Sequence, residues 1–182
     1  MTTGYNKIFW GFIFLTFHIN LGSIKLLPDF ISYIIIYFGI KELLEEYNLG
    51  SLKKASNCDS VLIFMAFIRL VINFSIGSEM INNIYFNIIW MNVFNIVEII
   101  MIYKLLVSNN EILNIKNNNL YENYNNKISM YIIIASIITV GNTINIIFYS
   151  EVIGGCIVLL ALALRLWIIM LVRKMHNLLK EA

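Results

Sequence analysis

The sequence predicts an all-α membrane protein with six transmembrane helices arranged as three hairpins. Of its 182 residues, 59% are apolar and only 13% are charged, whereas a soluble domain is about half apolar and about a quarter charged. The charged residues cluster between apolar runs that approach the ~20 residues a helix needs to cross ~30 Å of hydrocarbon. Runs such as Ile132–Ile138 do not alternate in polarity, which argues against barrel strands. We therefore expect a single integral membrane domain over residues 1–182.

The expected spans follow these apolar runs in order. The first is followed by no small-residue cleavage site, so we expect a retained helix rather than a secretory signal. The second has only fifteen residues between Lys25 and Lys41, and a tilted or re-entrant hairpin of the first two spans therefore stays open. For the other four we expect complete crossings. The expected spans are 8–24, 28–44, 60–77, 80–103, 128–149 and 152–172.

Lysine and arginine positions predict the orientation, because cationic loops resist translocation. With a cytoplasmic N-terminus, the outer connections carry Lys25 alone. The inner segments then carry Lys7, Lys41, Lys53, Lys54, Lys104, Lys116, Lys127, Arg173, Lys174 and Lys180. We expect a multi-pass protein of the bacterial cytoplasmic membrane with both termini in the cytoplasm. The connection 108–127 is rich in asparagine without an apolar period, so we expect a mobile cytoplasmic loop there.

Polar side chains inside the spans are the candidates for a binding site, because lipid tolerates ionised groups badly. Arg69, Glu98 and Arg165 have similar expected depths, and Arg69 is the favoured partner of Glu98 because a tight turn joins their spans. Two arginines beside one carboxylate leave a positive charge, which a small anionic or zwitterionic ligand, a lipid head group or carbonyl groups could satisfy. Helical phase adds asparagines on the same faces, although these could simply join helices. The added candidates are Asn73, Asn87, Asn95 and Asn142.

The first hairpin adds His18, Asp29 and Tyr33 as candidate ligand-binding residues. A plainer interpretation is a well-formed turn, in which Pro28 and Asp29 suit the first turn of a helix. His18 has no second histidine or cysteine nearby, so we expect no metal site.

The stretch INLGSIKLLPDFISYII resembles the signature of a group of small membrane proteins from low-GC Gram-positive bacteria. Their pattern is an Ile-Asn-x-Gly turn followed by Leu-Pro-Asp-Phe-Ile-Gly-Tyr. The matching residues are Asn20, Gly22, Leu27, Pro28, Asp29, Phe30, Ile31 and Tyr33. Ser32 stands where the pattern has glycine, which weakens the expectation of close helix packing at this position. The resemblance covers about residues 10–45 and implies an integral membrane protein without implying an activity.

The sequence carries no catalytic constellation. Metalloprotease, nucleophile-elbow, phosphate-loop and Cys-x-x-Cys motifs are all missing, so we expect no enzyme and no cofactor. The net charge of +2 gives no reason to expect nucleic acid as a partner. Besides the lipid bilayer, we expect a small solute that is bound or transported in a polar interior. The alternative is an interaction, immunity or sensor subunit whose buried charges pair with a partner membrane protein.

Overall fold

The computed structural model describes residues 3–17, 20–21, 24–25, 29–75, 84–116 and 122–181. Within these ranges nearly every residue is helical, which confirms the all-α class. The elements in chain order are α1 (Thr3–Thr16), β1 (Asn20–Leu21), β2 (Ile24–Lys25), α2 (Asp29–Tyr47), α3 (Gly50–Ser75), α5 (Ile84–Ile115), α6 (Glu122–Phe148) and α7 (Glu151–Glu181). The two short strands pair antiparallel, with Asn20 opposite Lys25.

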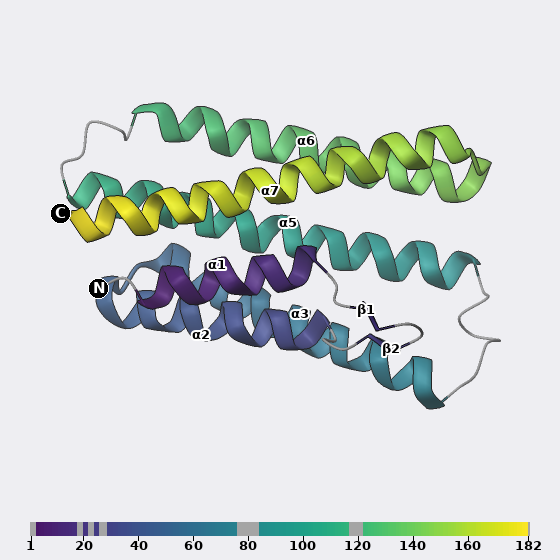
Figure 1. Cartoon of the computed structure of the whole chain (residues 1–182), viewed down its shortest axis with the longest axis horizontal. Helices are drawn as coiled ribbons and strands as arrows, with labels where there is room; N and C mark the ends of the chain where they lie inside the picture. Colours follow the sequence, from purple (N-terminus) through teal and green to yellow (C-terminus); the bar gives the residue numbers. More distant parts are fainter. Residues whose placement is uncertain are drawn as a thin grey trace.

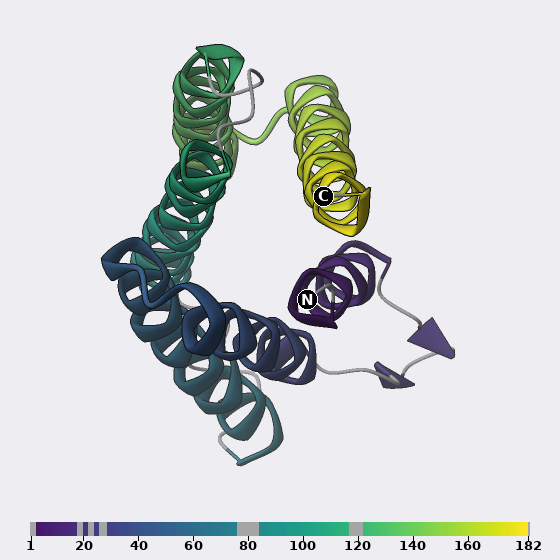
Figure 2. The same ribbon diagram turned by 90° about the vertical axis from the view of Figure 1, so that its left-hand side faces the viewer.

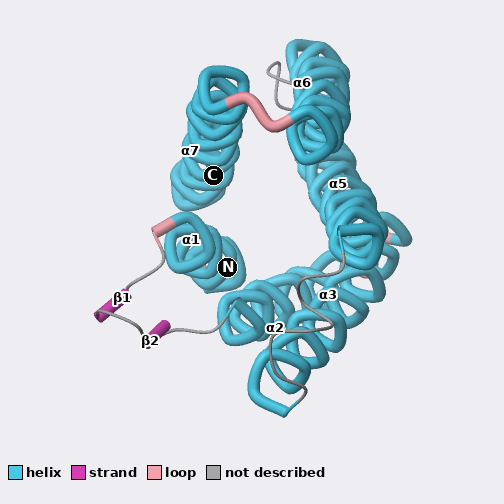
Figure 3. Tube along the Cα trace, turned by 90° about the vertical axis from the view of Figure 1, so that its right-hand side faces the viewer, coloured by secondary structure: helices cyan, strands magenta, loops and turns pink. Residues whose placement is uncertain are grey.

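The helices run along one axis, and each packs against its neighbours in a closed ring (Figure 1). α1 contacts α2 and α7, α3 lies between α2 and α5, and α6 lies between α5 and α7. The end-on views in Figure 2 and Figure 3 show the helices arranged in a ring around a common axis. Both termini lie at the same end of the bundle (Figure 1). The inner faces of helices far apart in the sequence therefore border a common space.

Four helices among the described residues, not six, are long and apolar enough to cross a membrane. They cover Gly50–Ile72, Tyr85–Ile115, Tyr124–Phe148 and Glu151–Lys180. α1 falls short because its 14 residues reach only ~21 Å at ~1.5 Å per residue. α2 has 19 residues, but its second half carries one lysine and three glutamates. The expectation of six complete spans was therefore wrong for 8–24 and 28–44, while the four long helices support a membrane-embedded protein.

The expected loop at 108–127 is largely helical. α5 continues to Ile115 and α6 begins at Glu122, while residues 117–121 lie outside the described part of the chain. Ile112 and Leu113 are buried, one heptad after two buried leucines, so the apolar period continues through the asparagines. Asn109 occupies a core position on the same face and accepts a hydrogen bond from the Tyr5 hydroxyl at 2.7 Å.

α1 and α2 form a tightly packed antiparallel hairpin. A Cβ atom at Gly39 would lie 2.7 Å from the carbonyl oxygen of Gly4, and one at Gly11 would lie 3.1 Å from that of Ser32. Ser32 is buried at this second contact. Close packing thus occurs where the family-like pattern has glycine, because Gly11 provides the space from the opposite helix.

An exposed ion pair joins the two helices of this hairpin at the end that holds the termini. The Lys7 ammonium donates a hydrogen bond to the Glu42 carboxylate, and this contact lowers the pKa of that carboxyl below its usual value. Because both side chains are partly exposed to solvent, the pair contributes little to stability.

Packing is densest in the half of the bundle that holds the termini. The first buried side chain in α5 is Met101, the first in α7 is Ile168, and the last in α6 is Ile138. In the other half, none of the described side chains of α5, α6 and α7 is fully buried. The interior space lies at the border between these two halves.

Candidate functional site

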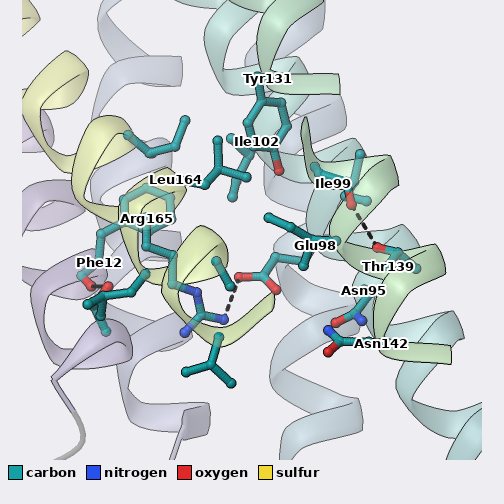
Figure 4. A pocket seen from close by; sticks show the side chains of 17 residues that line it. Phe12, Asn95, Glu98, Ile99, Ile102, Tyr131, Thr139, Asn142, Leu164 and Arg165 are labelled. Carbon is teal, nitrogen blue, oxygen red and sulfur yellow. Dashed lines mark hydrogen bonds and ion pairs between the residues drawn. The ribbon is translucent and has the colours of Figure 1, made fainter. Parts of the chain in front are cut away.

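A cavity of about 310 Å³ lies between α1, α5, α6 and α7. Its volume is at the lower end of the range for small-molecule sites, ~300–1,000 Å³. Figure 4 shows a charged pair and several polar side chains among apolar walls. The lining residues are Phe12, Thr16, Asn95, Glu98, Ile99, Ile102, Tyr131, Ala135, Ile138, Thr139, Asn142, Val158, Ala161, Leu162, Leu164, Arg165 and Ile168.

Glu98 and Arg165 form an ion pair at the wall of this cavity. α5 and α7 begin at the same end of the bundle (Figure 1), and each charged residue lies fourteen residues beyond the first residue of its helix. At ~1.5 Å per residue both therefore stand ~21 Å along the bundle. The Arg165 Nη2 group donates to Glu98 Oε1 at 3.4 Å. Equal depth on two facing helices is what allows the pair to form.

Arg165 also binds the end of α1. Its Nη1 group donates to the carbonyl oxygen of Leu15 at 3.2 Å. α1 ends at Thr16, so this carbonyl is one of the last four, which have no partner inside the helix and carry partial negative charge. The guanidinium thus has two negative partners, a carboxylate and a helix C-terminus, and it connects α7 to both α5 and α1.

Arg69 does not take the place expected for it. Its side chain is exposed on α3, and among the described residues the partner of Glu98 is Arg165. A turn shared by two helices brings their ends together, but Arg69 and Glu98 stand at different distances from that turn. The described lining of the cavity therefore holds one carboxylate and one guanidinium, so it carries no excess positive charge.

Two side-chain amides face the same cavity. Asn95 projects from α5 and Asn142 from α6, and Figure 4 shows them beside one another near Glu98. Within the described part of the chain, neither amide forms a hydrogen bond. The neighbouring Thr139 hydroxyl instead donates to the backbone of its own helix, at the Ala135 carbonyl, at 3.0 Å. Both amides can therefore donate to and accept from a bound molecule.

The next polar contact between α5 and α6 has a structural role. Thr143 donates from Oγ1 to the Asn92 side-chain oxygen at 2.9 Å, and the Asn92 amide donates to the Ile88 carbonyl, also at 2.9 Å. These groups satisfy one another across the helix interface, as membrane helices commonly do. The Thr143–Asn92 hydrogen bond therefore joins two helices, whereas the amides of Asn95 and Asn142 remain accessible from the cavity.

The remaining sequence candidates do not line the cavity. Tyr33 is fully buried and packs edge to face against Phe94 of α5, with ring centroids 5.8 Å apart. Asp29, in the first turn of α2, and Asn87, on α5, are half-buried away from the cavity lining. The Asn73 side chain and His18 lie outside the described residues.

Sequence reasoning missed the contribution of α1 and one aromatic side chain. Phe12 and Thr16 line the cavity one turn apart on α1, and Tyr131 lines it from α6. The helical phase of α6 could have predicted that Tyr131 lines the cavity. Tyr131 stands one turn before Ala135, on the face that Ala135 shares with Asn142. The Leu15 carbonyl is a backbone group, and no sequence signal could have identified it.

Comparisons with protein-family models, with curated proteins and with solved structures return no match to this chain. The described residues contain no group of three histidine, cysteine, aspartate or glutamate side chains that could hold a metal ion. The cavity itself is therefore the basis for a functional proposal.

Proposed function

We propose that this protein is a non-enzymatic membrane component that binds or moves a small solute in the cavity between α1, α5, α6 and α7. The observation that carries the proposal is the pair of amides Asn95 and Asn142, which form no hydrogen bond with any described residue and lie beside the Glu98–Arg165 ion pair. Both side chains are half-buried at the cavity wall, so their donors and acceptors are available to a bound molecule. Two open amides within a membrane bundle therefore favour a site that a polar molecule occupies.

The charge balance of the cavity favours a zwitterionic solute over a simple anion. Glu98 and Arg165 supply one charge of each sign, with Nη2 of the arginine 3.4 Å from Oε1 of the glutamate. A zwitterion can place its cationic group toward Glu98 and its anionic group toward Arg165, while the two amides supply hydrogen bonds. A lone anion would instead compete with Glu98 for the guanidinium and leave the carboxylate without its partner, which is costly in apolar surroundings.

We further propose that the end of the bundle with both termini faces the cytoplasm of a bacterial cell, because the basic residues of the sequence concentrate in segments at that end. The resemblance of residues 10–45 to small membrane proteins of low-GC Gram-positive bacteria supports the same membrane.

The test is thermal unfolding of the purified protein in mild detergent with a panel of small zwitterions, including free amino acids and trimethylammonio carboxylates. Matched simple anions and cations serve as ligand controls. We expect a zwitterion to raise the Tm of the wild type and of Arg69→Gln, whose side chain lies outside the cavity. The same ligand should not raise the Tm of Arg165→Gln or Asn142→Leu. Equal shifts in all four proteins, or no shift with any zwitterion, would contradict the proposal.

One observation favours a second function, that of an interaction subunit. Arg69 is exposed on α3, and it has no ion-pair partner among the described residues. A partner helix with an acidic side chain at the same depth would satisfy this charge. Under this alternative, protein purified from its native membrane migrates as a larger complex that Arg69→Leu reduces to the 21.1 kDa chain.

A further inference from the structure

A second carboxyl group, apart from the cavity, lies fully buried in the bundle. Asp59 stands in the part of α3 that covers the Gly50–Ile72 span, and its side chain is 0% exposed. Neither of its carboxyl oxygens has a hydrogen-bond partner among the described residues. α2 and α5 cover α3 on either side. Nothing in the solute-binding proposal uses this group.

Among the described residues, no group donates a hydrogen bond or forms an ion pair with the Asp59 carboxyl. Burial is the larger effect that disfavours a negative charge at Asp59, and the like charge of Glu98, on the neighbouring helix α5, adds to it. From α2, the nearby titratable group is Tyr33, whose hydroxyl is also buried without a partner in the described residues. The cationic side chain of Lys104, on α5, lies near the thiol of Cys58. Cys58 directly precedes Asp59 in the sequence and is half-buried.

An ionised carboxylate without donors costs far more in apolar surroundings than a neutral carboxylic acid does. A group in this position therefore takes up a proton rather than remain charged. We propose that Asp59 is a proton-binding site whose occupancy is coupled to the charge of Glu98 in the cavity. One proton from bulk water forms an O–H bond on one carboxyl oxygen, and nothing is oxidised or reduced. A neutral Asp59 adds no second negative charge near the Glu98–Arg165 ion pair.

Two nearby carboxyl groups in apolar surroundings do not ionise independently. A change in the charge of Glu98, whether by substitution or by a bound cationic group, therefore changes the proton affinity of Asp59. This inference goes beyond solute binding and does not depend on it, because it concerns the resting protein without a ligand.

Infrared spectroscopy of the full-length protein in lipid vesicles tests the proton directly. The chain has two aspartates, Asp29 and Asp59, against nine glutamates, so isotopically labelled aspartate separates the relevant bands. We expect a carboxylic-acid C=O band at neutral pH that shifts with the label, disappears in Asp59→Asn and persists in Asp29→Asn. The proposal would be overturned if the labelled aspartates gave only carboxylate bands and Asp59→Asn changed nothing in the region of the carboxylic-acid C=O band.

Titration of that band with pH tests the coupling. Removal of the like charge in Glu98→Gln should move the midpoint at which the Asp59 acid band disappears to lower pH. The matched control is Glu111→Gln, also on α5, whose carboxylate accepts a hydrogen bond from Ser51; its midpoint should stay at the wild-type value. If Glu98→Gln does not fold, Glu98→Asp, which keeps the charge, should retain the wild-type midpoint. A Glu98→Gln midpoint that is unchanged or higher, or a Glu98→Asp midpoint that falls, would refute the coupling.

Discussion

Replacing Gly39 by alanine should separate α1 from α2 and destabilise the protein. The new Cβ atom would lie 2.7 Å from the Gly4 carbonyl oxygen, whereas ordinary van der Waals contact begins at 3.4 Å. Ile8 Cγ1 would lie 2.6 Å away, and it is bonded directly to the Cβ of a fully buried, β-branched side chain that has little freedom to turn. The backbone oxygen cannot move aside either, so the two helices must move apart by about 0.7 Å at this contact.

The size of the effect follows from two opposed contributions. Overpacking costs about 1–3 kcal/mol, and about 2–3 kcal/mol applies at Gly39 because backbone atoms form part of the contact, while replacing glycine by alanine within a helix gains about 1 kcal/mol. We expect a net loss of about 1–2 kcal/mol, which lowers the Tm of a chain of this size by about 2–8 °C. Thermal unfolding in mild detergent, followed by circular dichroism, measures this loss.

Gly155→Ala is the matched control. Gly155 lies within α7, and a Cβ atom there would meet no atom within 4 Å, so the substitution should stabilise the protein by about 0.5–1 kcal/mol. Opposite signs for the two alanine variants are the expected result. A Gly39→Ala protein as stable as the Gly155→Ala protein would refute the close antiparallel packing of α1 and α2.

Three further predictions follow from named contacts. Glu98→Gln and Arg165→Leu should each cost about 1–3 kcal/mol, and the double variant should cost about 1–2 kcal/mol less than their sum; strict additivity in unfolding measurements would exclude the pair. Tyr5→Phe removes the hydroxyl that donates to a buried amide and should cost about 1–2 kcal/mol, whereas an unchanged Tm would argue against that bond. In intact cells, cysteine at the exposed Glu151 position should react with an impermeant thiol reagent, and cysteine at the exposed Lys180 position should not; the reverse labelling would invert the orientation.

The membrane class and the helical content could be predicted from composition, but the number of spans could not. The apolar run of α2 is interrupted by charges from Lys41 onward, and α1 ends at Thr16, about halfway along the bundle. The Asn-rich segment was misjudged because composition was given more weight than spacing. Asn109 stands on the buried face with Ile112 and Leu113, where a hydrogen bond satisfies its amide.

Part of the candidate site could be predicted because polar side chains on membrane helices turn away from lipid. Helical phase was sufficient to group Asn95 with Glu98 on α5, and Asn142 with Thr139 on α6. The choice of arginine partner depends on which helices face one another across the ring. That arrangement is set by the contact of α7 with α1, which are at opposite ends of the chain. Neighbourhood in sequence therefore favoured Arg69, whereas the folded chain brings Arg165 to the carboxylate.

The reaction of single cysteines with a small, charged thiol reagent in vesicles most directly tests whether the four helices enclose a cavity that water and solutes can enter. In a background without the two native cysteines, Asn95→Cys and Asn142→Cys should react, because both positions line the cavity. The neighbouring Ile96→Cys and Val140→Cys, on exposed apolar positions of the same helices, should react much more slowly because lipid covers them. Equal rates within each pair, or faster reaction at the apolar positions, would contradict a solute-accessible interior.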